Sequence, residues 1–220
     1  MTAAAFFDVD ETLISVKSMF DFLEFHLAAC GEPPETYRRL ISRVDAAKAR
    51  GASRDTALRE YFRLLAGQRA DRLARSGEAW FADRLARGGL FIEPVLAELR
   101  AHRADGAAAV LLSGSFFACL DPVAEHVGAE RTFGTRPTVR RGELTGEILA
   151  PMIGGAKART AGLAATVRGW NLAECAAYGD HPSDLPLLEA VGHPVVVGAD
   201  PVMSERAGRI GWRRIHVSTG

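Results

Sequence analysis

Short apolar runs alternate with stretches of helical periodicity over most of the chain. The run at 107–112 is continuous, which is typical of a strand buried on both faces of a parallel sheet. Strands alternating with helices indicate an α/β fold built on a parallel sheet. We predict strands at 5–7, 107–112, 175–178 and 194–197, helices at 94–103, 116–127, 157–168 and 185–191, and a hairpin with strands at 138–140 and 144–148 around Arg141-Gly142.

Residues 15–87 follow a different pattern, in which apolar side chains recur at helical spacing with no strand-like run between them. Glycine and proline interrupt the pattern at several points and separate one helix from the next. This predicts a small helical bundle inserted after the first strand. We therefore expect a core domain formed by residues 1–14 and 89–220, and a helical cap domain formed by residues 15–88.

The composition narrows the class of protein. Of 220 residues, 48% are hydrophobic and 25% are charged, as in an ordinary folded domain. Lys+Arg and Asp+Glu are both 27, so the net charge is zero, which argues against a general nucleic-acid binder. No apolar run approaches the roughly 20 residues that span a bilayer, so we expect no membrane partner.

The cysteines and the N-terminus suggest a location. Cys30, Cys119 and Cys175 have no CxxC spacing, which predicts neither a zinc site nor a disulfide framework. A reducing cytoplasm is the simplest expectation. The segment from Met1 to Phe7 is apolar, uncharged and very short, so we read it as a buried first strand and not as a signal peptide.

Several of the predicted strands end in polar residues. The first is followed by Asp8-Val9-Asp10-Glu11-Thr12, the second by Ser113-Gly114-Ser115 and the third by Gly179-Asp180, while Lys157 lies near the start of a helix. Ligands of open α/β sheets bind at the carboxyl ends of the strands. We therefore expect one edge of the sheet to gather carboxylates, a hydroxyl and an ammonium group.

Asp8 and Asp10 are the first candidates for catalysis. In a tight loop both can face one pocket, where one carboxylate attacks an electrophile and the other handles protons. The alternative is that these residues and Thr12 only cap a turn or a helix start, as acidic loops commonly do. The spacing alone leaves both interpretations open.

Asp180 favours a metal site. It follows another strand and is trailed by Asp184, and a further carboxylate close to Asp8 would make a cluster of like charges. A divalent cation removes that cost, and Mg²⁺ typically binds through one or two carboxylates together with a substrate phosphate. Asp184 is also a suitable cap for the helix that begins at Leu185.

Ser113, Gly114 and Lys157 suit an anion. The Ser113 hydroxyl and the backbone amides around Gly114 are able to hold phosphoryl oxygens at a helix N-terminus. Lys157 adds a point charge. Ser113 also suits a helix cap, and a lone lysine is normally a solvated surface residue.

Taken together, these residues resemble the haloacid dehalogenase superfamily of phosphotransferases. The motifs occur in the family order, as Phe7-Asp8-Val9-Asp10-Glu11-Thr12-Leu13, Leu111-Leu112-Ser113-Gly114-Ser115, Lys157 and Tyr178-Gly179-Asp180-His181-Pro182-Ser183-Asp184. The insertion after the first motif resembles the helical (C1-type) cap of the phosphoserine-phosphatase-like branch, subfamily IB. The resemblance implies a Rossmann-like parallel-sheet core with that cap.

The resemblance also implies a role for each motif residue. Asp8 would be the nucleophile that forms an aspartyl-phosphate, and Asp10 would protonate the leaving alcohol and later activate water. Ser113, with Gly114, and Lys157 would hold the phosphoryl oxygens. Mg²⁺ would be held by Asp8, the backbone carbonyl of Asp10, and Asp180. Two residues would support that metal site from behind, namely Thr12 and Asp184, the latter also holding Lys157.

The cap departs from the phosphoserine phosphatase pattern. Lys17 stands where those enzymes usually carry the glutamate that meets the substrate's amino group. Tyr61 stands where they carry an arginine for the substrate's carboxylate, although Arg59 or Arg63 is close enough in the sequence to compensate. Lys17 is also readily explained as a solvated linker residue. If Lys17, Tyr61 and Arg59 do face the substrate, the usual contacts to the amino and carboxylate groups of an amino-acid substrate are missing.

The leading hypothesis is thus a Mg²⁺-dependent phosphatase of a small phosphorylated metabolite. A phosphoserine phosphatase with relocated contacts is the alternative within that class. A non-hydrolytic phospho-acceptor or regulatory module is the alternative outside it, and Asp10 discriminates against it, because receiver domains lack a second aspartate at that spacing. The sequence predicts neither the substrate nor the oligomeric state.

Overall fold

The computed structural model describes residues 3–217, and residues 1–2 and 218–220 of the predicted core lie outside that range. Within it, a six-stranded parallel sheet runs in the order β3-β2-β1-β6-β7-β8. Its strands are β1 (Ala4–Phe7), β2 (Ala108–Leu112), β3 (Arg131–Phe133), β6 (Ala176–Gly179), β7 (His193–Val197) and β8 (Arg213–Ile215). The fold is therefore the predicted α/β class.

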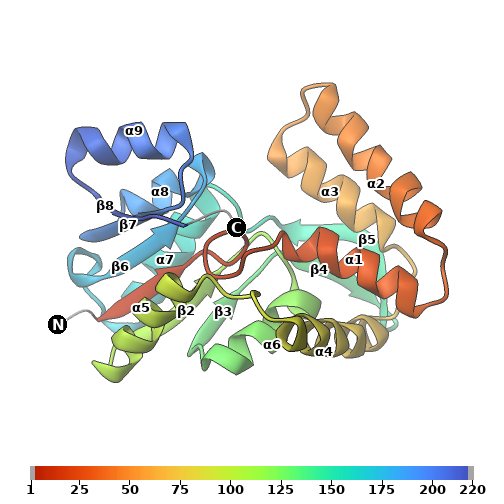
Figure 1. The fold of residues 1–220 in the computed structure, drawn as a ribbon, viewed down its shortest axis with the longest axis horizontal. Coiled ribbons are helices and arrows are strands. Elements are labelled where there is room, and N and C mark those ends of the chain that lie inside the picture. The colour runs from red at the N-terminus through yellow and green to blue at the C-terminus, as the bar shows by residue number, and fades with distance from the viewer. Residues whose placement is uncertain (1–2, 218–220) are drawn as a thin grey trace.

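Helices cover both faces of this sheet (Figure 1). One face packs against α5 (Glu93–Ala104) and α6 (Phe117–Val127). The other face packs against α7 (Gly155–Arg168), α8 (Leu185–Leu188) and α9 (Pro201–Ile210). Short 3₁₀ turns, η1 (Leu172–Glu174) and η2 (Pro182–Asp184), flank β6. Because β1 and β2 are buried on both faces, every side chain along them is apolar.

The inserted region forms the predicted helical cap, to one side of the sheet in Figure 1. Its helices are α1 (Ser18–Ala29), α2 (Pro34–Ala49), α3 (Arg54–Leu64) and α4 (Ala70–Arg87). Phe22 of α1 and Phe62 of α3 both pack edge-on against Phe116, which precedes α6, at ring-centroid distances of 5.7 and 5.4 Å. The cap and one face of the sheet therefore share one continuous apolar core.

The predicted hairpin is present as β4 (Arg136–Arg140) and β5 (Glu143–Ala150), with Arg141 in the left-handed region at its turn. It forms a separate two-stranded sheet. Backbone hydrogen bonds join it to the loop between α3 and α4, from Gly67 to the Leu144 carbonyl and from Leu144 to the Gln68 carbonyl. A segment that the sequence places in the core domain thus pairs with the cap.

Further differences from the sequence prediction concern the edge strands and two helices, of which the one predicted at 185–191 ends at Leu188. β3, β8 and α9 were not expected, and β3 and β8 are the two edge strands. Each has only three residues and carries arginine, so neither shows the apolar run that marks a buried strand. Among residues 3–217, no helix has the length and apolarity that a membrane span needs.

Candidate active site

The strand order explains why the predicted residues meet. β1 lies between β2 and β6, with Phe7 in register with Leu111 on one side and Tyr178 on the other. Asp8 therefore emerges from the sheet between Ser113, which follows β2, and Asp180, which follows β6. The loop after β1 then turns sharply at Glu11, whose φ of 60° lies in the left-handed region, and Asp8 and Asp10 line the same cavity.

Lys157 and two carboxylates form a buried ion cluster. The Lys157 Nζ lies 2.7 Å from the Asp8 Oδ1 and 2.6 Å from the Asp184 Oδ1. Burial lowers the pKa of Lys157, but the two carboxylates together raise it by a larger amount. The net effect is a raised pKa, so Lys157 keeps its proton. Asp184 also caps η2, because its Oδ2 accepts a hydrogen bond from the His181 backbone N–H at 3.3 Å.

Asp180 completes a group of carboxylates. Oxygens of Asp8, Asp180 and Asp184 all lie within 4.8 Å of one another. Burial, together with the other two carboxylates, raises the pKa of Asp8, and Lys157 opposes this. Burial also raises the pKa of Asp180, against a hydrogen bond from the Thr12 Oγ1 to its Oδ1 at 2.7 Å. One lysine does not neutralise three carboxylates, and a divalent cation with a preference for oxygen ligands, such as Mg²⁺, fits this donor set.

Asp10 has a different environment. Its side chain lines the same cavity, yet its Oδ1 is buried without a hydrogen-bond partner among residues 3–217. Burial raises the pKa of Asp10 to about 6, while hydrogen bonds from Ser18 and the charge of Lys157 limit the rise. A carboxyl group with a pKa of about 6 and an oxygen that lacks a hydrogen-bond partner suits proton exchange with a substrate.

Ser113 and Gly114 line the wall of the cavity beside Asp8. The Ser113 Oγ accepts a hydrogen bond from the Ser115 backbone N–H at 3.0 Å, and this leaves the Ser113 hydroxyl proton for another acceptor. The Ser113 side chain is buried, so its rotamer is held in place. The predicted anion-binding residues Ser113, Gly114 and Lys157 therefore come together around Asp8.

The cavity has a volume of about 400 Å³. It extends to the cap from a floor at the edge of the sheet, which Asp8, Asp10, Ser113, Lys157, Asp180 and Asp184 form or support. The predicted residues that line it are Asp8, Asp10, Lys17, Tyr61, Ser113, Gly114, Lys157 and Asp180. Thr12 and Asp184 are fully buried and support that lining from behind. Arg59 is not brought to the cavity, since its guanidinium pairs with Asp55 at 2.8 Å one turn earlier on α3.

Two of the predicted cap residues line the cavity with their polar groups already engaged. The Tyr61 hydroxyl donates a hydrogen bond to the Met19 carbonyl at 2.6 Å, and its side chain is buried. The Lys17 Nζ lies 3.4 Å from the Glu11 Oε2, and its side chain is 61% exposed. Tyr61 therefore presents its ring to the cavity, and the charge of Lys17 is partly neutralised.

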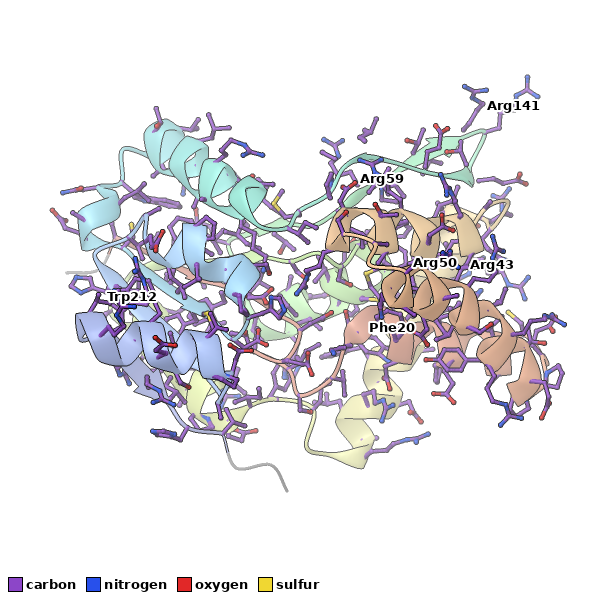
Figure 2. All side chains as sticks on the ribbon, turned by 90° about the horizontal axis from the view of Figure 1, so that it is seen from above. Phe20, Arg43, Arg50, Arg59, Arg141 and Trp212 are labelled. Carbon is purple, nitrogen blue, oxygen red and sulfur yellow. The ribbon has the colours of Figure 1, made fainter. Side chains whose placement is uncertain are left out.

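Several residues that line the cavity were not predicted from the sequence. They are apolar residues from α1 to α3 and the loops beside them, together with Lys48, Arg54, Ile153 and His181. In Figure 2, Phe20 lies among the cap helices, whereas Arg59 lies nearer the hairpin. No local signal marks Arg54 or Lys48, because an arginine at a helix start and a lysine on an amphipathic helix are normally solvated.

Comparison with known proteins agrees with this arrangement. A family model of haloacid dehalogenase-like hydrolases matches residues 5–189. A probable phosphatase from Mycobacterium tuberculosis is 37% identical over 114 residues, which are 52% of this chain and 40% of that relative. The chain therefore spans less than half the length of that relative.

Solved structures show the same fold. A protein of unknown function from Bordetella pertussis superposes with a TM-score of 0.85 at 27% identity, over 96% of this chain and 97% of that one. A phospho-aspartyl intermediate analogue of phosphoserine phosphatase superposes with a TM-score of 0.65 at 18% identity, over 93% and 90% of the two chains. With the family match over most of its length, the chain belongs to the haloacid dehalogenase-like hydrolases, with a phosphoserine-phosphatase-like fold.

Proposed function

We propose that the protein is a Mg²⁺-dependent phosphatase that hydrolyses a small phosphomonoester through an aspartyl-phosphate on Asp8. The observation that carries the proposal is the pairing of two unlike carboxyl groups in one cavity. Asp8 is paired with Lys157, whereas Asp10 has a buried oxygen without a hydrogen-bond partner among residues 3–217 and a pKa of about 6. One group is thus placed for attack and the other for proton transfer.

The reaction has two steps, transfer of the phosphoryl group to Asp8 and hydrolysis of the aspartyl-phosphate. An Asp8 carboxylate oxygen attacks phosphorus while the bond from phosphorus to the leaving oxygen breaks, and Asp10 gives its proton to that oxygen. A water then attacks the phosphorus of the aspartyl-phosphate, Asp10 takes the water's proton, and Asp8 is released with inorganic phosphate. Ser113, the amides near Gly114 and Lys157 hold the phosphoryl oxygens in line.

The cation would be held by Asp8, Asp180 and the Asp10 backbone carbonyl, and it would neutralise charge on the phosphoryl group. Asp184 keeps Lys157 in place from behind, and Thr12 orients Asp180 through its hydrogen bond. We also propose the division into a core, residues 1–14 and 89–220, and a cap, residues 15–88. The cap would exclude water once substrate is bound.

The two alternatives fit the cavity less well. A phospho-acceptor module has no use for Asp10, a carboxyl group that lines the cavity and has a buried oxygen without a hydrogen-bond partner among residues 3–217. A phosphoserine phosphatase needs a carboxylate for the substrate ammonium, and the position expected for it holds Lys17. The test is phosphate release from a panel of phosphomonoesters with Mg²⁺, with Asp8→Asn as the inactive control. No release from any member of the panel would refute the proposal.

A further inference from the structure

The cap side of the cavity is lined by apolar side chains. The residues that form this surface, called here the cap wall, are Met19, Phe20, Val44, Ala57, Leu58 and Tyr61. The one hydroxyl group on the cap wall belongs to Tyr61 and is bonded to the Met19 carbonyl. The hydroxyl groups of a sugar or polyol would lose water there without gaining partners. The cap wall therefore favours an apolar body in the leaving group.

The charged groups on the cap side are cationic. Lys17, Lys48 and Arg54 line the cavity, and none of its lining carboxylates comes from α1, α2, α3 or the loops between them, which are all within the described residues. Lys17 pairs with Glu11 at 3.4 Å, and Lys48 pairs with Asp45 at 3.4 Å. An ammonium group on the leaving group would meet three cations on this side, and Glu11, the carboxylate beside Lys17, is already paired with it.

Arg54 is the cation without a carboxylate partner. No carboxylate oxygen of residues 3–217 lies within 4 Å of its guanidinium. Asp10, Glu11 and Asp180 line the same cavity as Arg54 without pairing with it. Its Nη1 instead contacts the His181 Nδ1 at 2.7 Å, which leaves other N–H groups of the fork without a partner there. A guanidinium with open donors at the rim of a cavity suits a carboxylate or a phosphate.

Resting on the proposed function, we propose that the leaving group has an apolar body that packs on the cap wall and a second anionic group that Arg54 binds. The phosphoryl group being transferred occupies the floor, where Ser113 and Lys157 hold it. Lys48, whose Nζ lies 4.8 Å from the Phe20 ring centre, places a positive charge beside the cap wall. The substrate class is thus an apolar phosphomonoester with a carboxylate or a second phosphate.

Paired synthetic substrates separate the two parts of this proposal. Hexyl phosphate and 6-phosphooxyhexanoate share an apolar chain and differ in the terminal carboxylate, while ethyl phosphate lacks most of the chain. We expect kcat/KM to rise at least about tenfold from ethyl to hexyl phosphate, because each buried methylene contributes about fourfold. We expect a further gain of about tenfold for 6-phosphooxyhexanoate, from one charge-assisted hydrogen bond.

Arg54→Gln tests the assigned residue, and Arg50→Gln is the matched control. Arg50, at the end of α2 (Figure 2), is another exposed cap arginine with no carboxylate within 4 Å among residues 3–217, and it does not line the cavity. Arg54→Gln should remove the roughly tenfold gain of 6-phosphooxyhexanoate over hexyl phosphate, measured as the ratio of the two kcat/KM values. Arg50→Gln should leave that ratio at its wild-type value.

Each other outcome overturns the proposal in a different way. An equal loss on both substrates in Arg54→Gln would mean that Arg54 acts on the transferred phosphoryl group. No gain from ethyl to hexyl phosphate, or better hydrolysis of phosphoserine or glycerol phosphate, would refute the apolar cap wall as a specificity surface. In those cases the proposed phosphatase function stands, whereas no hydrolysis of any phosphomonoester refutes both.

Discussion

The floor and the cap wall of one cavity are built on opposite principles. On the floor, the side chains of Asp8, Lys157 and Asp184 are buried and paired at 2.6–2.7 Å. On the cap side, cations such as Lys17 and Arg54 are exposed and stand beside an apolar surface. Buried pairs hold reacting groups in one geometry, whereas exposed cations adapt to different ligands. From this difference we expect that residues at the edge of the sheet carry out the chemistry and that the cap selects the substrate.

The most severe change to the floor is Asp8→Asn. An amide does not attack phosphorus, so we expect turnover to fall by more than about 1,000-fold. The fold should survive, because the asparagine is nearly isosteric and Lys157 keeps Asp184 as a partner. Phosphate release on the best panel substrate measures the loss, with circular dichroism as the folding control. Activity above roughly a thousandth of wild type would refute covalent catalysis by Asp8.

Metal binding separates the residues within the floor. Excess chelator should stop turnover, and added Mg²⁺ should restore it, whereas Ca²⁺ should substitute poorly because it prefers more ligands at longer distances. Asp180→Asn should weaken Mg²⁺ binding by more than about 100-fold, and Asp184→Asn by about 10-fold, since Asp184 acts through Lys157. Calorimetric titration measures both. Full activity in chelator would exclude the metal site, and a larger effect of Asp184→Asn would reverse the two roles.

The junction between cap and core depends on a close helix approach. A Cβ at Gly77 of α4 would lie 1.8 Å from the Ala118 carbonyl oxygen of α6, so Gly77→Ala should cost about 1–3 kcal/mol in the free energy of unfolding. Gly162→Ala on α7 is the matched control, because a Cβ added at Gly162 would meet open space. That change should stabilise the protein by about 0.4–1 kcal/mol.

Urea unfolding measures both glycine variants. A Gly77→Ala variant as stable as wild type would mean that α4 moves freely on α6, and that the cap is not held against the core at this point.

The smallest effect is expected on the cap side, at Lys17. Its side chain is 61% exposed and pairs with Glu11, so its charge is largely screened. Lys17→Glu should raise the ratio of kcat/KM for phosphoserine over hexyl phosphate by only about threefold. An unchanged ratio would show that Lys17 is a solvated residue. A wild-type enzyme that prefers phosphoserine would contradict the contrast between floor and cap wall itself.

The floor was predictable because its signals are local. Asp8, Ser113 and Asp180 each follow an apolar run, and parallel strands bring their carboxyl ends to one edge. The cap side of the cavity was not predictable, because its residues come together only through the packing of helices. The sequence pattern places Tyr61 at an arginine position, but its hydroxyl donates a hydrogen bond to the Met19 carbonyl. In the sequence, Arg54 looks like an ordinary residue at the start of a helix. Only the packing of α3 beside His181 brings it to the cavity.

The central claim is that Asp8 carries the phosphoryl group during turnover. Acid quenching of the enzyme during hydrolysis of ³²P-labelled 6-phosphooxyhexanoate, or of the best panel substrate, followed by peptide mapping, tests it directly. We expect label on the peptide containing Asp8, lost on treatment with hydroxylamine and absent from Asp8→Asn. Label on another residue, or turnover without any labelled enzyme in a quench fast enough to resolve the first cycle, would contradict it.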